Sequence, residues 1–270
     1  MGCGNIRMLQ RRGNQGLGLP MKSRAKWLQE KKSEAQQLGD LATKDIVPSR
    51  SDFSQFIGSQ RTDLALVPRL KRADPFTGSD WPDADLVALA RLFDDTDVGA
   101  LAVCTSNLHR GAADDINAIR AAASAPLLRD DLCLDDAQVY DARLRGADAV
   151  RIPLAELEPT AVSRLSDIAL SLHMTAVFDA ACAADLDRAP MQAPNVIGLN
   201  CSGADGFVDI EAVARLADEA PRHLVVVVLA EIRSFEDADA LRGVVDGLVV
   251  GDLLLAAANP LEVVERILQP

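Results

Sequence analysis

The chain has 270 residues, of which 49% are hydrophobic and 25% are charged, so it can bury a large core and is not dominated by disorder. Its 28 lysines and arginines against 40 aspartates and glutamates give a formal net charge of -12. That charge repels nucleic-acid phosphates and anionic lipid headgroups. We therefore expect neither a nucleic-acid partner nor a membrane partner.

The cysteines and the apolar segments indicate the compartment. Five cysteines are present without a CxxC or Cys/His spacing, which is too few for a disulfide scaffold in a chain of this length. The apolar runs are shorter than the roughly 20 residues that a membrane-spanning helix needs, and the N-terminus lacks the apolar core of a secretory signal. We expect a cytoplasmic protein with no metal site and no cofactor.

The N-terminal part divides into two segments. Residues 1–20 are rich in glycine and arginine and contain no carboxylate, a composition that predicts a disordered tail. Residues 21–60 are predicted to form a helical extension. Within it, Met21–Leu38 is rich in strong helix formers, and Trp27 and Leu28 are the candidate anchors of its apolar face.

Short apolar runs alternate with helix-forming segments over residues 61–270. The predicted strands are Leu64–Leu70, Ala100–Cys104, Pro126–Arg129, Asp148–Pro153, Met174–Asp179, Asn195–Asn200, His223–Leu229 and Asp246–Val250. The predicted helices are Asp83–Phe93, Ala113–Ala123, Ala137–Leu144, Glu158–Leu172, Ile210–Glu219 and Phe235–Leu241. This alternation predicts an α/β fold, a TIM (β/α)8 barrel. The rival is an open doubly wound sheet, but its dinucleotide-binding form needs a GxGxxG turn that this sequence lacks.

An ordered series of motifs runs from about Met21 to the end of the chain. The motifs are Ser51-Asp52-Phe53, Lys71-Arg72-Ala73, Pro126-Leu127-Leu128-Arg129, Gln138-Val139-Tyr140, Gly146-Ala147-Asp148-Ala149-Val150, Ile197-Gly198-Leu199-Asn200 and Ile232-Arg233. Together they resemble indole-3-glycerol-phosphate synthase, the tryptophan-pathway barrel that closes the indole ring with loss of carbon dioxide and water. Each motif alone is weak, whereas the ordered series is specific.

The resemblance implies roles for residues at the strand ends, where active sites of this fold lie. Lys71 and Asn200 match residues that handle the anthranilate-derived ribulose phosphate of the family, and Asp179 is a weakened match to a third. Asp179 stands where the family has a glutamate base, so its carboxylate is drawn back by one methylene. Arg233 and Gly251 fall near the phosphate site, which such barrels build from backbone N–H groups after the last two strands.

Other positions depart from the family pattern. They are Arg69, Asp130, Ser202, Ala230, Glu231 and Asp252. Arg69 replaces a glutamate and Asp130 replaces the general-acid lysine, and an ionised aspartate donates no proton unless burial or Asp131 raises its pKa. Glu231 replaces a glycine of the phosphate site. If Glu231 and Asp252 face that site, each carboxylate at ~5 Å from a phosphate costs on the order of 3 kcal/mol.

Structural roles remain open for several of these residues. Lys71 is either a site residue or a solvated rim lysine, and Asp179 is either a base or the partner of Lys71 or Arg129 in a structural ion pair. Asn200 is either a substrate ligand or a loop cap. A run of acidic residues is expected at a solvated rim and a helix N-cap: Asp130, Asp131, Asp135 and Asp136.

Three functional hypotheses follow. The departures favour a divergent member of the family whose ring-closing decarboxylation is lost or altered and whose C-terminal face takes a less anionic small molecule. The alternative is an active synthase, a carboxy-lyase, with Lys71 as acid, Asp179 as base and Arg233 at the phosphate. The third is a non-catalytic scaffold for a protein partner, which predicts a filled barrel mouth and an apolar patch on the outer helices.

Overall fold

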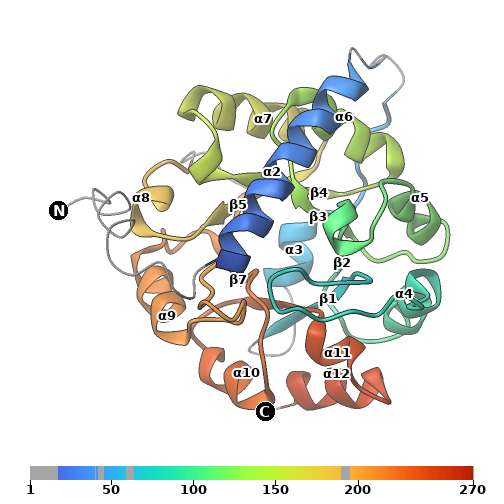
Figure 1. Cartoon of the computed structure of the whole chain (residues 1–270), viewed down its shortest axis with the longest axis vertical. Helices are drawn as coiled ribbons and strands as arrows, with labels where there is room; N and C mark the ends of the chain where they lie inside the picture. Colours follow the sequence, from blue (N-terminus) through green and yellow to red (C-terminus); the bar gives the residue numbers. More distant parts are fainter. Residues whose placement is uncertain (1–17, 40, 42–45, 59–63, 190–194, 270) are drawn as a thin grey trace.

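A computed structural model describes residues 18–39, 41, 46–58, 64–189 and 195–269. Its centre is a closed barrel of eight parallel strands that follow one another in chain order, with helices around it (Figure 1). The predicted TIM barrel is therefore confirmed. Most of the predicted disordered tail lies outside the described residues, and the first described helix begins at Gly18, ahead of the predicted start at Met21.

The strands and helices have the following bounds. The strands are β1 (Ala65–Leu70), β2 (Leu101–Val103), β3 (Leu127–Leu132), β4 (Ala149–Pro153), β5 (Thr175–Ala180), β6 (Asn195–Leu199), β7 (Val225–Val228) and β8 (Gly247–Val250). The helices are α2 (Gly18–Leu38), α3 (Phe53–Gly58), α4 (Leu86–Asp94), α5 (Asp114–Arg120), α6 (Asp136–Arg145), α7 (Pro159–Ser171), α8 (Ala183–Leu186), α9 (Ile210–Glu219), α10 (Phe235–Leu241), α11 (Asp252–Leu255) and α12 (Pro260–Leu268). Short 3₁₀ turns follow β2 and β4 at Asn107–His109 and Leu154–Glu156.

The strands read as continuous apolar runs because both of their faces are buried. One face packs against the surrounding helices, and the other fills the barrel interior with a cluster that includes Val67, Leu128 and Val177. Helix α3 closes the N-terminal end of the barrel, since Phe53 and Ile57 belong to this interior cluster. The C-terminal end is therefore the end that is open to ligands.

Side-chain caps explain where five of the eleven described helices begin. Aspartate, serine or asparagine accepts a backbone N–H bond at the start of five helices: Asp85, Asp135, Asp209, Ser234 and Asn259. Gly146 ends α6 with a φ of 106°, a conformation that favours glycine. These local signals agree with the predicted helices, and the bounds of α9 and α10 are those expected from the sequence.

One strand is longer than the sequence predicts. β3 continues past Arg129 through Asp130 and Asp131 to Leu132, with a register shift against β4 in this stretch. Because successive residues of a strand point to opposite faces, the two aspartates are directed to different surroundings. Both are buried, which contradicts the solvated rim expected for them.

Helix α2, dark blue in Figure 1, crosses the C-terminal end of the barrel. Trp27 Nε1 and Lys31 Nζ each lie 2.6 Å from a carboxylate oxygen of Asp131, and the side chain of Lys31 is fully buried. The N-terminal helix is thus bound to the strand ends by buried polar contacts. None of the helices described here is long and apolar enough to span a membrane.

Candidate functional site

A cavity of about 470 Å³ opens at the C-terminal end of the barrel beside α2. One part of its wall is aromatic: the ring centroid of Trp27 lies 5.3 Å from that of His109 and 5.8 Å from that of Phe76. The remaining wall carries charged groups from the strand ends, with Arg69 and Asp130 among them. The structure thus has an open pocket where the scaffold hypothesis predicts a filled mouth.

A chain of ion pairs crosses the mouth from β1 to β5. Arg69 Nε lies 2.6 Å from Asp130 Oδ2, Arg151 Nη1 lies 2.8 Å from Asp130 Oδ1, and Arg151 Nη2 lies 2.8 Å from Asp179 Oδ2. All four side chains are buried. Asp179 therefore does form an ion pair, but its partner is Arg151 rather than Lys71 or Arg129.

Asp130 is locked in its ionised form. Burial alone would raise the pKa of its carboxyl, but the guanidinium groups of Arg69 and Arg151 lower that pKa well below its usual range. The condition under which Asp130 would donate a proton is therefore not met. At the position where the family that the sequence resembles has its general-acid lysine, this chain has a carboxylate that holds no proton to donate.

Lys71 lies at the centre of a second cluster. Its Nζ is 2.6 Å from a carboxylate oxygen of each of Asp74, Glu231 and Asp252, and its side chain is fully buried. Burial would lower the pKa of this ammonium group, but the three carboxylates raise it above its ordinary value. The alternative of a solvated rim lysine is wrong, and Lys71 holds its proton at neutral pH.

Glu231 joins the two clusters and reaches the start of α11. Its Oε1 lies 2.8 Å from Arg69 Nη1 and 2.6 Å from Lys71 Nζ. Its Oε2 accepts hydrogen bonds from the backbone N–H groups of Gly251 and Asp252, each at 3.0 Å. In TIM barrels, backbone donors at this place bind phosphate. Here they already bind a carboxylate of the chain itself.

Gly251 is needed because the network passes so close to it. A Cβ atom there would lie 2.7 Å from Lys71 Cε and 2.8 Å from Glu231 Oε1, which real Cβ contacts do not allow. Asp252 is held from its other side, where its Oδ2 accepts hydrogen bonds from Thr77 and Ser79 at 2.6 and 2.7 Å. The β1–α4 loop is thereby attached to the same network.

The remaining predicted site residues separate into two groups. Asn200, Ser202 and Ala230 line the cavity as the strand-end argument expects. Arg233 does not line it: its guanidinium is more than half exposed, forms an ion pair with Asp205 and lies 4.8 Å from the ring centroid of Phe207. The side chain of Arg233 thus contacts Asp205 and Phe207, which precede α9.

The sequence reasoning missed some residues of the site. Arg151 was assigned only to a strand, although a charged residue inside an apolar strand is a signal that a buried partner exists. His109 has no role in the sequence analysis, yet it is buried at the site, and its Nδ1 lies 2.7 Å from Ser106 Oγ. Asp185, which also lines the cavity, carried no signal beyond its place after β5.

The acidic run that begins inside β3 and ends at the start of α6 has two kinds of role. Asp130 and Asp131 are buried and ion-paired, so the expected solvated rim is wrong for them. Asp135 caps α6 as expected and forms a capping box with Gln138. The physical reason for the difference is that α2 covers this part of the mouth and supplies Lys31 to Asp131.

His109 predicts a pH dependence of stability. Desolvation by burial lowers the pKa of its imidazole to about 4 from 6.5. Between these two values the unfolded chain binds a proton that the folded chain does not, so stability is lost as the pH falls. We expect this residue to contribute a loss of about 3 kcal/mol from pH 7 to pH 4.

Urea unfolding of the wild type and of His109→Gln, measured at several pH values from 7 to 4, checks this contribution. His109→Gln should flatten the pH dependence, whereas the matched variant His223→Gln alters a histidine that is exposed and should leave it unchanged. Equal slopes for the wild type and His109→Gln would contradict the buried, neutral imidazole.

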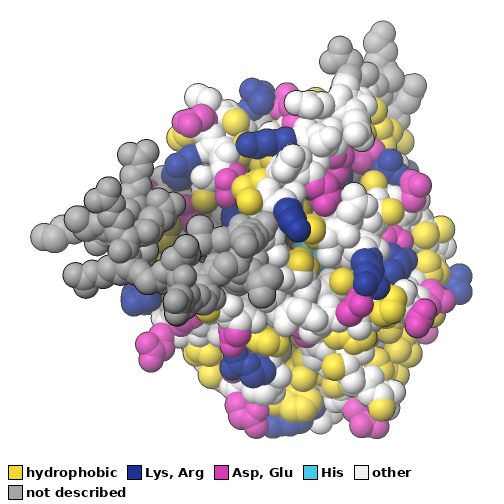
Figure 2. Space-filling view, in the orientation of Figure 1, with side chains coloured by type: hydrophobic (Ala, Val, Ile, Leu, Met, Phe, Trp, Pro, Cys, Tyr) yellow, Lys and Arg dark blue, Asp and Glu magenta, His cyan; other side chains and the backbone are white. Residues whose placement is uncertain are grey.

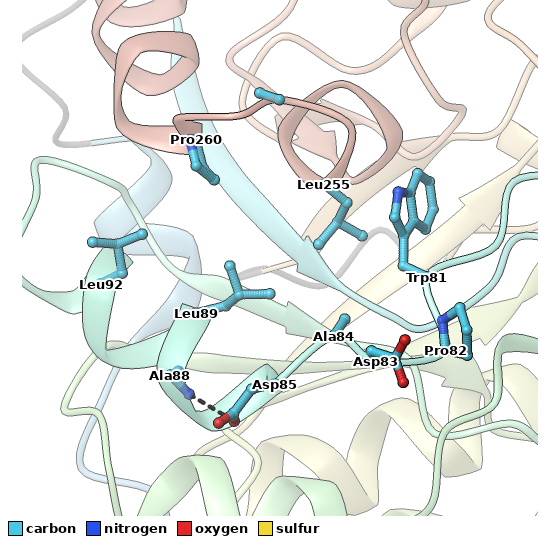
Figure 3. Close-up of a pocket in the computed structure, with 11 residues that line it drawn as sticks. Trp81, Pro82, Asp83, Ala84, Asp85, Ala88, Leu89, Leu92, Leu255 and Pro260 are labelled. Atoms are coloured by element: carbon cyan, nitrogen blue, oxygen red, sulfur yellow. Dashed lines mark hydrogen bonds between the residues drawn. The ribbon is translucent and has the colours of Figure 1, made fainter.

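A second hollow lies on the ring of helices, and its Trp81 ring has its centroid 5.9 Å from Lys71 Nζ. It has a volume of about 700 Å³ and runs between α4 and the α11–α12 segment, with Trp81 and Leu92 among its lining residues (Figure 3). Leu89, Leu255 and Pro260 make it mostly apolar. It has the place and the apolar character of the patch that the scaffold hypothesis predicts. Its two carboxylates, Asp83 and Asp85, lie just before α4, where Asp85 caps the helix.

The charge on the surface is mixed. On the face shown in Figure 2, Lys and Arg side chains are interspersed with Asp and Glu side chains among the described residues and form no single basic patch. This distribution agrees with the net charge of -12. It offers no stripe that would follow a nucleic-acid backbone.

Comparisons with known proteins match the chain to one family. Residues 20–267 match the family model described as indole-3-glycerol phosphate synthase. The synthase of that name from Mycobacterium ulcerans (strain Agy99) is 32% identical over 200 residues, which cover 73% of this chain and 74% of the relative. The one from Mycobacteroides abscessus is 30% identical over the same shares.

Solved structures show the same architecture. The 3-hexulose-6-phosphate synthase of Salmonella typhimurium has a TM-score of 0.60 at 16% identity, covering 76% of this chain and 97% of that chain. The orotidine 5'-phosphate decarboxylase of Pyrococcus horikoshii OT3 has a TM-score of 0.54 at 15% identity, covering 75% and 96%. At these identities the likeness concerns the fold alone.

Proposed function

The chain belongs to the indole-3-glycerol phosphate synthase family, and from this premise we propose that it is a divergent member that does not carry out the family's ring-closing decarboxylation. Its barrel mouth instead binds a less anionic small molecule. The observation that carries the proposal is the Glu231 carboxylate, which occupies the backbone donors of Gly251 and Asp252.

A phosphate ester finds little to bind at this mouth. The two backbone N–H groups after β8 already have an anionic acceptor, and a second anion beside it meets like charge. The nearby cations are also engaged, since Arg69, Lys71 and Arg151 each contact at least two carboxylates. Binding phosphate would require breaking buried ion pairs, which costs several kcal/mol.

Proton transfer by the family's groups is also disfavoured. Asp130 holds no proton and Lys71 does not release one at neutral pH, because each is surrounded by opposite charge. Asp179 Oδ2 accepts two N–H groups of Arg151, at 2.8 and 3.1 Å, so it is held as a counter-ion rather than as a free base. General acid–base catalysis needs groups whose pKa values lie near the working pH.

A turnover assay tests the proposal directly. The purified chain is incubated with the anthranilate-derived ribulose phosphate, and formation of indoleglycerol phosphate is followed by its absorbance and by mass. We expect no product above the enzyme-free rate. Product formation that saturates with substrate would establish the alternative, an active synthase, and overturn the proposal.

Removing the Glu231 carboxylate should make the backbone N–H groups after β8 available to phosphate. Glu231→Gly frees the N–H groups of Gly251 and Asp252, while Lys71 keeps Asp74 and Asp252 as partners. We expect the variant to gain about 1.4 kcal/mol of stability at a phosphate concentration about ten times its Kd, and the wild type to gain nothing. A thermal-shift titration with inorganic phosphate measures the difference.

The matched control is Glu231→Gln, which removes the charge but leaves an amide oxygen that accepts the same two backbone N–H groups. It should therefore bind phosphate more weakly than Glu231→Gly. If the wild type binds phosphate as strongly as Glu231→Gly does, the carboxylate does not block the site.

A further inference from the structure

One carboxylate on the cavity wall has no cationic partner among the described residues. Asp185 is 7% exposed, and its Oδ2 accepts hydrogen bonds from the backbone N–H groups of Ala181 and Cys182 at 2.9 and 3.2 Å. It forms no ion pair with the part of the chain that the structure describes, although it lines the cavity. A buried carboxylate without a counter-charge is unfavourable, so a cation that enters the cavity would be stabilised there.

The other carboxylates of the wall differ from Asp185 in this respect. Asp74 is paired with Lys71, Asp130 with Arg69 and Arg151, and Glu231 with Arg69 and Lys71. Their charges are compensated within the chain. Asp185 is the lining carboxylate whose charge is left for a ligand.

The cations of the wall are already engaged. Arg24 forms an ion pair with Glu156, and Arg69 and Arg151 share Asp130. A ligand anion would have to displace one of these carboxylates, whereas a ligand cation would displace nothing. The cavity thus favours a positively charged ligand over a negatively charged one.

The uncharged part of the wall suits a flat apolar group. Trp27, Phe76 and His109 form a cluster of rings with centroids 5.3 to 6.2 Å apart, and the His109 ring is neutral at pH 7. The side-chain amide of Asn200 also lines the cavity and makes no hydrogen bond within the described residues. The volume of about 470 Å³ lies within the range of small-molecule sites.

We propose that the cavity binds a small organic cation of the aryl-alkyl ammonium class, with its ammonium at Asp185 and its ring against the Trp27, Phe76 and His109 cluster. This inference rests on the proposed function and deepens it, because it names the class of the less anionic ligand. It makes no claim that the ligand reacts.

Calorimetric titration of the full chain with three probes of one shape tests the inference. The probes are 2-phenylethylammonium, the neutral 2-phenylethanol and the anionic 3-phenylpropionate. A charge-assisted hydrogen bond at a buried carboxylate predicts that the ammonium binds at least about tenfold more tightly than the alcohol. The carboxylate probe should show no binding.

Two aspartate variants locate the effect. Asp185→Asn removes the charge but keeps an oxygen that accepts the N–H groups of Ala181 and Cys182, so the start of α8 is preserved. It should weaken binding of the ammonium by about tenfold and leave binding of the alcohol unchanged. Asp187→Asn makes the same change at an exposed position nearby and should leave both affinities unchanged.

The outcomes separate this inference from the proposed function. Equal affinity for the ammonium and the alcohol, full ammonium affinity in Asp185→Asn, or no ammonium binding at all would overturn the organic-cation inference. Each of these results leaves the turnover assay to decide the proposed function by itself. Turnover of the ribulose phosphate would overturn the proposed function whatever the three probes do.

Discussion

Lys71→Met is expected to lower the free energy of unfolding by about 3–5 kcal/mol at pH 7, because it leaves buried charges without their counter-ion. Oxygens of Asp74, Glu231 and Asp252 lie within 4.8 Å of one another, and Lys71 Nζ is the charge between them. Methionine keeps most of the side-chain volume, so the loss reports charge rather than a cavity. Urea unfolding measures it.

The pH dependence of the variant gives an independent check. With Lys71 present, burial raises but Lys71 lowers the pKa of Asp74, which lies at about 2 instead of 3.8. Without Lys71, burial and the neighbouring carboxylates raise this pKa, so the variant takes up protons at a higher pH and its deficit shrinks as the pH falls.

The matched control is Lys32→Met, which alters an exposed lysine of α2 and should change stability by less than about 0.5 kcal/mol. A loss of similar size for both variants at pH 7 would mean that the three carboxylates are hydrated and that the cluster does not depend on Lys71.

Exchanging the charges of Arg69 and Asp130 is expected to show strong coupling. Arg69→Glu places a carboxylate beside Asp130 and Glu231, and Asp130→Lys places an ammonium beside Arg69 and Arg151. Each single variant should lose about 3–5 kcal/mol or fail to fold. The double variant re-forms the pair with reversed polarity and should recover at least about 2 kcal/mol beyond additivity.

A surface pair provides the control for this exchange. Arg233 and Asp205 form an ion pair whose side chains are more than half exposed, so Arg233→Glu with Asp205→Lys should show a coupling below about 1 kcal/mol. Chemical unfolding of the wild type, the four single variants and the two double variants measures both coupling energies. If the two pairs couple equally, burial does not strengthen the Arg69–Asp130 contact.

The fold was predictable because its signals are local. Apolar runs of strand length, helix formers between them, and caps such as Asp209 and Ser234 lie next to the elements they define. The extension of β3 was not predictable in this way, since Asp130 and Asp131 do not resemble strand residues. Their burial depends on Arg69, Arg151 and Lys31, which come from other elements.

The position of the candidate site was predictable from the sequence, but the contacts among its charged residues were not. The strand-end rule brings Lys71, Glu231 and Asp252 together as expected. Their partners could not be read from the sequence, because Arg69 lies 61 residues from Asp130 and 162 residues from Glu231. No periodicity encodes such contacts, and which carboxylate faces which cation depends on the closed barrel.

The departures from the family pattern are coupled rather than independent. Arg69 contacts both Asp130 and Glu231, so three altered positions belong to one set of ion pairs. Their contacts join residues 61 and 162 positions apart, so the sequence alone does not show that the changes belong together. In the structure the positive charge of Arg69 is paired with the negative charges of Asp130 and Glu231. The three changes at the barrel mouth therefore form one ion-paired group.

The carboxylate of Glu231 differs from an anion in solution in its effective concentration at the backbone N–H groups. Because it is tethered to the chain, it is present at the start of α11 at a high effective concentration that dilution does not reduce. A sugar phosphate would have to displace this tethered carboxylate, however dilute the protein is. Glu231 should therefore compete with phosphate more persistently than an anion in solution would.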